Sequence, residues 1–203
     1  MTRRRVAVLG ATGAVGQAFI RLLSRHPWFE LGELAASERS LGKRYGEAAR
    51  WLGGELAGDI ASMPVLACDP SAITSELVFS ALDSSVAGEV EAAFARAGHT
   101  VVSNAKNHRM ESDVPLVIAE VNPEHMALLD AQRTARGWNG AIVTNGNCST
   151  IALVSAVAPL HRAFGIRRMV VVTMQALSGA GYPGVPSLDA LGNVIPFIRD
   201  EEE

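Results

Sequence analysis

The sequence predicts an α/β fold, in which a doubly wound parallel sheet is followed by an incomplete second α/β domain. Short apolar strand-like runs alternate with helical segments through the first two-thirds of the chain. A glycine-rich turn joins the first such strand to the first helix, and the pattern changes near residue 140. Regular alternation of strand and helix implies βαβ units with helices on both faces of the sheet. We therefore expect one domain over residues 1–145 and the beginning of another over residues 146–203.

The individual elements follow from hydrophobic patterning. Continuous apolar runs, which are typical of strands buried on both faces, cover residues 5–10, 31–36, 77–82, 100–103 and 141–145. Apolar residues recur at helical spacing over residues 17–24, 87–97 and 151–164. The β-branched run 168–177 is predicted as a further strand. The Gly- and Pro-rich stretch 178–186 is predicted as a loop.

Composition excludes several classes of protein. The chain has 203 residues, a net charge of −3, 48% hydrophobic residues and 19% charged residues, so a core can form and disorder is excluded. A near-neutral balance argues against a nucleic-acid binder, and no apolar run approaches the ~20 residues of a membrane span. Cys68 and Cys148 are too few for a disulfide framework. We expect a soluble cytoplasmic protein without a metal site.

The glycine-rich turn has the context of a dinucleotide-binding motif. Residues 10–16 read Gly-Ala-Thr-Gly-Ala-Val-Gly and lie between the first strand and the first helix. The first glycine permits the tight turn, the second lets the backbone approach a pyrophosphate, and the third allows close helix–strand packing. This pattern predicts a Rossmann domain whose phosphate-binding backbone belongs to Gly10, Thr12, Gly13, Ala14 and Val15.

The end of the second predicted strand indicates which cofactor binds. NAD sites usually place an acidic residue there, whereas NADP sites use Arg or hydroxyl groups for the 2′-phosphate. Ser37, Arg39 and Ser40 form a plausible phosphate site, while Glu38 would suit a ribose 2′-hydroxyl. The composition favours NADP over NAD.

Cys148 lies after a predicted strand and just before the apolar helix 151–164. The positive end of a helix dipole stabilises a thiolate, which makes this cysteine a candidate nucleophile. Ser149 and Thr150 can supply capping oxygens. The alternative is a small buried apolar residue, the commoner fate of a lone cysteine. Cys68 lacks this setting and is expected to serve packing only.

Five ordered motifs together resemble the aspartate-semialdehyde dehydrogenase family, most closely its archaeal and fungal-type branch. They lie at residues 10–16, 35–40, 103–109, 145–150 and 175–181. The resemblance implies reduction of L-aspartyl 4-phosphate with NADPH to L-aspartate 4-semialdehyde and phosphate, in lysine, threonine and methionine biosynthesis. It also implies a homodimer or homotetramer that is formed through the second domain.

The resemblance further implies roles for individual residues. Cys148 corresponds to the nucleophile that forms a thioester, and Gln175 to the glutamine that orients the substrate. Arg109, with Asn104 on the same loop, corresponds to the site of the substrate phosphate, and Glu201 to the residue that contacts the substrate amine. The remaining cofactor contacts implied are Ser80, Ser178 and Gly179.

The sequence also departs from the family pattern. The family's general-base histidine lies further along than residue 203, and no histidine of this chain stands in its motif; they are His26, His99, His108, His125 and His161. We therefore expect a truncated chain with little or no turnover by itself. Two alternatives stay open: a related acyl-thioester reductase, acting on malonyl-CoA or N-acetylglutamyl phosphate, and a noncatalytic NADP-binding fragment.

Overall fold

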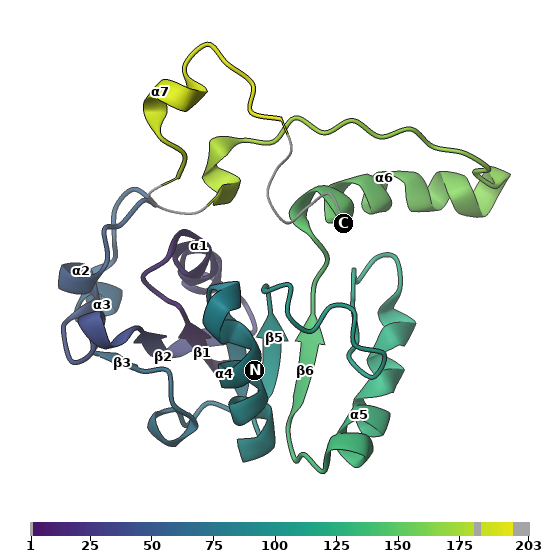
Figure 1. Ribbon diagram of the computed structural model, residues 1–203. Coiled ribbons are helices and arrows are strands. Elements are labelled where there is room, and N and C mark those ends of the chain that lie inside the picture. The colour runs from purple at the N-terminus through teal and green to yellow at the C-terminus, as the bar shows by residue number, and fades with distance from the viewer. Residues whose placement is uncertain (1, 181–183, 197–203) are drawn as a thin grey trace. The chain divides into compact units, whose positions relative to one another are not determined.

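The computed structural model describes residues 2–180 and 184–196, and the chain divides into two compact units, 1–170 and 171–203. The first unit contains a six-stranded sheet in the order β3-β2-β1-β4-β5-β6, with every neighbouring pair parallel (Figure 1). Its strands are β1 (Arg4–Leu9), β2 (Phe29–Ala36), β3 (Val65–Ala67), β4 (Leu77–Ser80), β5 (Thr100–Ser103) and β6 (Ala141–Thr144). The predicted doubly wound parallel sheet is confirmed. Its strand order reverses between β1 and β4, where dinucleotide-binding folds place their ligand crevice.

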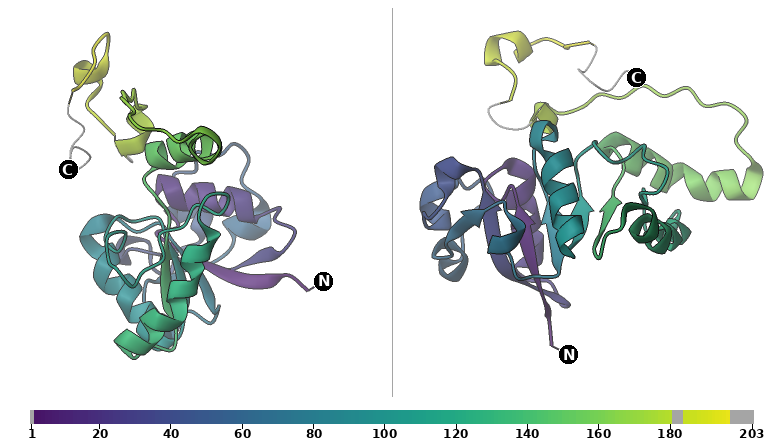
Figure 2. Two further views of the ribbon diagram at one scale, coloured as in Figure 1. Left: turned by 90° about the vertical axis from the view of Figure 1, so that its right-hand side faces the viewer. Right: turned by 60° about the horizontal axis from the view of Figure 1, so that its bottom comes forward.

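Helices cover both faces of this sheet, as the two views of Figure 2 show. One face packs against α1 (Ala14–Leu23), α2 (Tyr45–Ala48) and α3 (Gly58–Ala61), and the other against α4 (Ser84–Ala97). Helix α5 (Leu128–Arg136) lies beside β6. The sequence analysis missed β3, which is short, and α5, whose composition is strongly polar.

Burial of the central strand β1 on both faces explains why its residues 6–9 are all apolar. Val6 and Val8 pack with Ile20 in the core under α1, while Ala7 and Leu9 belong to the core on the α4 side. All of these residues are fully buried. Successive side chains of a strand point to opposite faces, so a strand with both faces covered needs an uninterrupted apolar run.

The outer edge of β6 is closed by the backbone of residues 115–117 at Thr144 and by a side chain at Ile142. The Gln132 amide of α5 accepts a hydrogen bond from the Ile142 amide nitrogen at 2.8 Å and donates to the Ile142 carbonyl oxygen at 3.0 Å. Gln132 is fully buried. Because an exposed strand edge leaves backbone groups unpaired, this amide stabilises the last strand before the cysteine turn.

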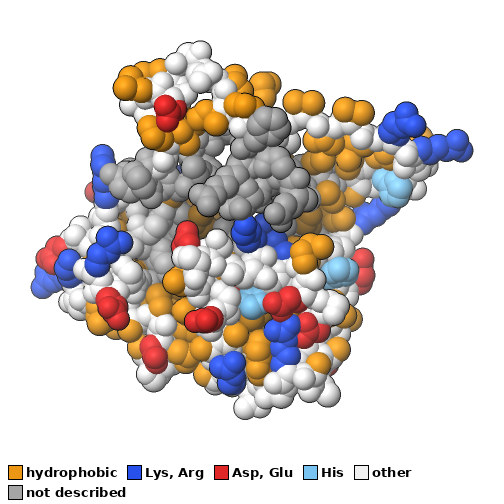
Figure 3. Space-filling model, viewed as in Figure 1, with side chains coloured by type: hydrophobic (Ala, Val, Ile, Leu, Met, Phe, Trp, Pro, Cys, Tyr) orange, Lys and Arg blue, Asp and Glu red, His pale blue; other side chains and the backbone are white. Residues whose placement is uncertain are grey.

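Helix α6 (Cys148–Phe164) follows β6 and has no fully buried residue among those described. Apolar side chains gather over it in Figure 3, and Leu160 and Phe164 are exposed. No helix in the described parts of the chain is long and apolar enough to cross a membrane.

The predicted strand over residues 168–177 is wrong. Residues 165–176 form neither helix nor strand, and the second unit contains a short turn, Leu177–Ala180, and α7 (Ser187–Ala190). β-Branched residues favour a strand only where a neighbouring strand pairs with the backbone. Nothing in the described ranges pairs with this segment.

Candidate functional site

The glycine turn after β1 requires glycine at its first and last positions. Gly10 has a positive φ of 69°, and a Cβ there would lie 2.5 Å from the Ala81 carbonyl oxygen. A Cβ on Gly16 would lie 2.2 Å from the Gly10 carbonyl oxygen. Both contacts are with backbone atoms, which cannot move away by a change of rotamer as a side chain can. Because Gly10 and Gly16 have no side chains, the turn can pack closely against the start of α1 and against the chain after β4.

Gly13 differs, because its backbone is compatible with other residues. Its φ is −75°, and an added Cβ would meet its nearest described neighbour, the Gly10 carbonyl oxygen, at an ordinary 3.4 Å. Gly13 is the N-cap of α1, which has no side-chain cap and no acidic residue in its first turn. Its backbone N–H groups thus suit an anion. The turn therefore has the features expected of a pyrophosphate site, and the contact with a dinucleotide stays a prediction.

The predicted 2′-phosphate residues lie at the carboxyl end of β2. Ser37 and Arg39 are exposed, whereas Ser40 is almost fully buried and its amide nitrogen donates to the Ser37 carbonyl oxygen at 2.9 Å. β2 is parallel to β1 and adjacent to it, so these residues share an edge of the sheet with the glycine turn. Glu38 is also exposed there. The side chains that face solvent are thus Ser37, Glu38 and Arg39.

Cys148 is the first residue of α6 and is exposed. The alternative of a small buried residue is therefore wrong. Asn147 is the N-cap, and its side-chain oxygen accepts from the amide nitrogens of Ser149 at 2.9 Å and Thr150 at 3.4 Å. The capping oxygen thus comes from Asn147, not from Ser149 or Thr150. The cap satisfies the backbone around the cysteine and leaves its thiol at the positive end of the helix.

Cys68 has a different environment. It is half-buried and packs beside the core on the α4 face of the sheet. Burial raises the pKa of the Cys68 thiol. The structure supports the expected packing role of this residue.

A hydrogen-bonded pair of asparagines joins the ends of β5 and β6. The Asn145 side-chain amide donates to the Asn104 side-chain oxygen at 2.9 Å, and the Arg109 guanidinium donates to the Asn104 carbonyl oxygen at 2.9 Å. Arg109 and Asn104 therefore lie on the sheet edge from which the chain continues into Cys148. The sequence analysis gave Asn145 no role. Its position directly after a strand, three residues before the cysteine, is the signal that could have identified it.

Of the other predicted residues, Ser80 adjoins this cluster, because its carbonyl oxygen accepts from the Asn104 amide nitrogen at 3.0 Å. Ser80 is fully buried; burial raises the pKa of the neighbouring Glu91, and the Ser80 and Ser103 hydroxyls only partly oppose that rise. Gln175, Ser178 and Gly179 belong to the second unit. Glu201 lies outside the described residues. The roles of these residues stay predictions.

Comparison with known proteins identifies the family. Residues 5–129 match the family described as "Semialdehyde dehydrogenase, NAD binding domain". The chain belongs to this family. Residues 157–203 match "Semialdehyde dehydrogenase, dimerisation domain", so the expected second domain is present in part.

Individual relatives agree with this assignment. The chain is 55% identical over 202 residues to an aspartate-semialdehyde dehydrogenase of Archaeoglobus fulgidus, covering 99% of this chain and 59% of the relative. Identity to the Schizosaccharomyces pombe enzyme of that name is 49%, over 100% of this chain and 58% of the relative. The Candida albicans aspartate-semialdehyde dehydrogenase, solved with NADP, superposes with a TM-score of 0.84 at 42% identity, over 98% of this chain and 57% of that chain. The resemblance to archaeal and fungal enzymes is confirmed, and the chain spans somewhat over half the length of these relatives.

Proposed function

We propose that this chain carries the NADP-binding and nucleophile-bearing part of an aspartate-semialdehyde dehydrogenase. The observation that carries the proposal is the exposed Cys148 at the start of α6, on the sheet edge that also holds Arg109. The glycine turn after β1 supports it, because its free helix N-terminus suits a dinucleotide. The names of the related proteins provide the substrate class.

The first chemical step assigns a role to Cys148. Its thiolate attacks the acyl carbon of L-aspartyl 4-phosphate, a C–S bond forms, and the C–O bond to the phosphate breaks with release of inorganic phosphate. The N-terminus of α6 favours the thiolate. Arg109 presents a planar guanidinium that suits the phosphate oxygens, and Asn104 orients it through the carbonyl contact at 2.9 Å.

NADPH, when bound, supplies the hydride that reduces the thioester to the aldehyde and frees the Cys148 thiolate. The backbone of residues 10–16 binds the pyrophosphate, and Ser37 and Arg39 bind the 2′-phosphate, with the buried Ser40 supporting their turn. Ser80, Ser178 and Gly179 complete the proposed cofactor contacts. On the substrate, Gln175 orients the acyl group and Glu201 contacts the amine. The assembly proposed is a homo-oligomer formed through the segment that matches a dimerisation domain.

Mass spectrometry of the acylated protein tests this proposal. Incubation with L-aspartyl 4-phosphate, generated in situ, should add an aspartyl group to the Cys148 peptide and release phosphate. Cys148→Ser should remove the adduct, while Cys68→Ser should leave it in place. Acylation by malonyl-CoA in preference to aspartyl phosphate would favour the related reductase, and absence of acylation by either would refute the nucleophile assignment.

A further inference from the structure

The loop that carries Arg109, residues 104–111, follows β5. A guanidinium on a loop binds a phosphate well only if its position is fixed before the ligand arrives, because ordering it on binding costs free energy. The Asn104 carbonyl oxygen orients the guanidinium from within this same loop. The contacts that fix the loop itself must therefore come from residues outside it.

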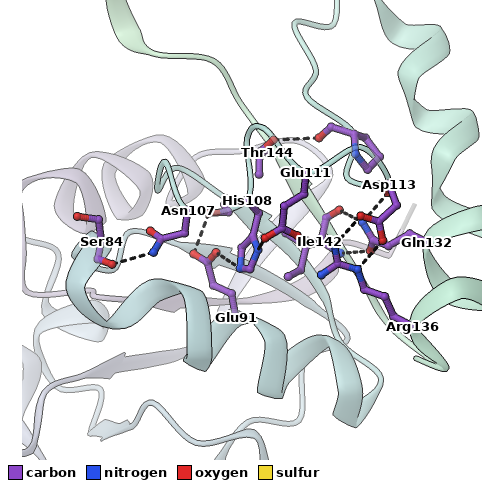
Figure 4. Close-up of polar contacts among 12 residues, drawn as sticks. Ser84, Glu91, Asn107, His108, Glu111, Asp113, Gln132, Arg136, Ile142 and Thr144 are labelled. Atoms are coloured by element: carbon purple, nitrogen blue, oxygen red, sulfur yellow. Dashed lines mark hydrogen bonds and ion pairs between the residues drawn. The ribbon is translucent and has the colours of Figure 1, made fainter. Parts of the chain in front are cut away.

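Glu91 of α4 lies between that helix and this loop (Figure 4). Its side chain is fully buried. The Ser103 hydroxyl donates to Glu91 Oε1 at 2.8 Å and accepts from the Ala105 amide nitrogen at 3.1 Å. One hydroxyl thus ties the beginning of the loop to the carboxylate. Burial raises the pKa of Glu91, and the neighbouring Ser80, Ser103 and His108 oppose that effect.

His108, the residue before Arg109, is buried, and its imidazole lies beside the Glu91 carboxylate. Its Nε2 lies 3.7 Å from Glu91 Oε2, and its Nδ1 lies 2.9 Å from Glu111 Oε1. Figure 4 shows the imidazole between the two carboxylates. Glu111 is in turn paired with Arg136 of α5. Both ring nitrogens are directed at protein carboxylates, so this histidine is not placed to exchange protons with a substrate.

Asn107 provides a third attachment of the loop to α4. Its side-chain amide donates to the Ser84 carbonyl oxygen at 2.8 Å. A Cβ on Gly88 would lie only 3.2 Å from that amide nitrogen, so α4 and the loop are in close contact here. The two residues that precede Arg109 are therefore both attached to α4.

We propose that Glu91 and His108 are positioning residues that fix Arg109 for phosphate binding, with Asn107 as a peripheral support. The inference rests on the proposed function of Arg109. A buried pair of polar side chains adds little net stability compared with apolar residues of similar size, but it can specify one conformation. Here that conformation is the one in which Asn104 and Arg109 reach the edge of the sheet beside Cys148.

Inorganic phosphate affinity, measured by calorimetry on the protein saturated with NADP, tests the proposal. Saturation removes competition from the 2′-phosphate site. Glu91→Gln and His108→Gln should each weaken phosphate binding roughly tenfold to a hundredfold, as expected for a misplaced binding group, and His108→Gln should leave NADP affinity unchanged. His99→Gln is the matched control, because it removes a half-buried imidazole that contacts the Ser75 carbonyl oxygen instead of the loop.

A double-mutant cycle with Arg109→Ala shows whether the pair acts through Arg109. In that background, Glu91→Gln and His108→Gln should cause no further loss. If either variant fails to fold, Asn107→Ala decides, since Asn107 is exposed and its loss should weaken phosphate binding without lowering the melting temperature. Unchanged phosphate affinity in the folded variants would overturn the proposal. If Arg109→Ala itself leaves phosphate binding intact, the proposed role of Arg109 is wrong; if only Cys148 acylation fails, the positioning inference stands.

Discussion

Substituting alanine for the glycines of the 10–16 turn separates packing from cofactor binding. In Gly16→Ala the new Cβ would lie 2.2 Å from the Gly10 carbonyl oxygen and 2.8 Å from Ala11 Cα. An ordinary contact needs about 3.4 Å, so α1 and the turn must separate by about 1 Å. In Gly13→Ala, by contrast, the new Cβ would already sit at 3.4 Å from that oxygen.

The expected cost follows from these distances. Overpacking of this kind costs about 1–3 kcal/mol, and at about 2–4 °C per kcal/mol for a chain of this size Gly16→Ala should lower the melting temperature by roughly 2–12 °C. Gly13→Ala should lower it much less, because φ is −75° and alanine restricts the unfolded chain, which offsets the lower preference for alanine at an N-cap. It should nevertheless weaken NADPH binding, because its Cβ occupies the space that a pyrophosphate would approach.

Thermal unfolding followed by circular dichroism, with NADPH affinity from fluorescence titration, measures both effects. Gly58→Ala is the control, since a Cβ there meets no described atom within 4 Å. If Gly16→Ala melts like Gly58→Ala, the close contact between the turn and α1 is wrong. If Gly13→Ala binds NADPH as well as the unsubstituted protein, the turn does not hold the pyrophosphate.

Three further predictions follow from the structure. Iodoacetamide at neutral pH should label the exposed Cys148 before Cys68, whose thiol pKa is raised by burial; peptide mass spectrometry that finds the reverse order contradicts the nucleophile assignment. Gln132→Leu should cost about 2–4 kcal/mol in urea unfolding, because two backbone groups of β6 lose their partner; Gln132→Glu should cost at least as much at neutral pH, because a buried carboxylate would face the Ile142 carbonyl oxygen. Arg136 lowers the pKa of Asp113 below its ordinary 3.8, so the ion pair contributes to stability, by about 0.5–1 kcal/mol after solvent screening. This contribution is present at neutral pH and is lost as the pH falls through that lowered pKa. The deficit of Arg136→Gln should therefore shrink below about pH 4, and a deficit independent of pH would refute this.

The sequence predicted the parts of the fold whose local signals are strong. The apolar residues 6–9 of β1 and the two valines of β5 identify these strands within one residue of their observed bounds. Helix α5 was missed because its stability comes from Gln132 and Arg136, which make long-range contacts that no local pattern reveals. The opposite error concerns residues 168–177, whose β-branched composition favours a strand that has no described partner.

The candidate site could be predicted only where neighbouring residues in the sequence determine the local geometry. A glycine turn between strand and helix carries its geometry in the sequence, because Gly10 and Gly16 are required by close backbone contacts. The neighbours of Arg109 could not be found in this way. Glu91 and Asn145 reach that loop from α4 and from the end of β6, and only the order of strands in the sheet brings them together.

The helix N-termini of α1 and α6 both start at the carboxyl edge of the sheet but differ in how they are capped. Gly13 gives α1 no side-chain cap, so its first N–H groups are available to an external anion. In α6, Asn147 accepts from the amide nitrogens of Ser149 and Thr150, so the backbone donors are largely satisfied. An uncapped helix end suits a bound phosphate group, whereas a capped end favours the charge of a residue that belongs to the protein. The dipole of α1 can thus support cofactor binding, and the dipole of α6 can support the reactive sulfur of Cys148. The N-cap residue, Gly13 in α1 and Asn147 in α6, distinguishes the two helix ends.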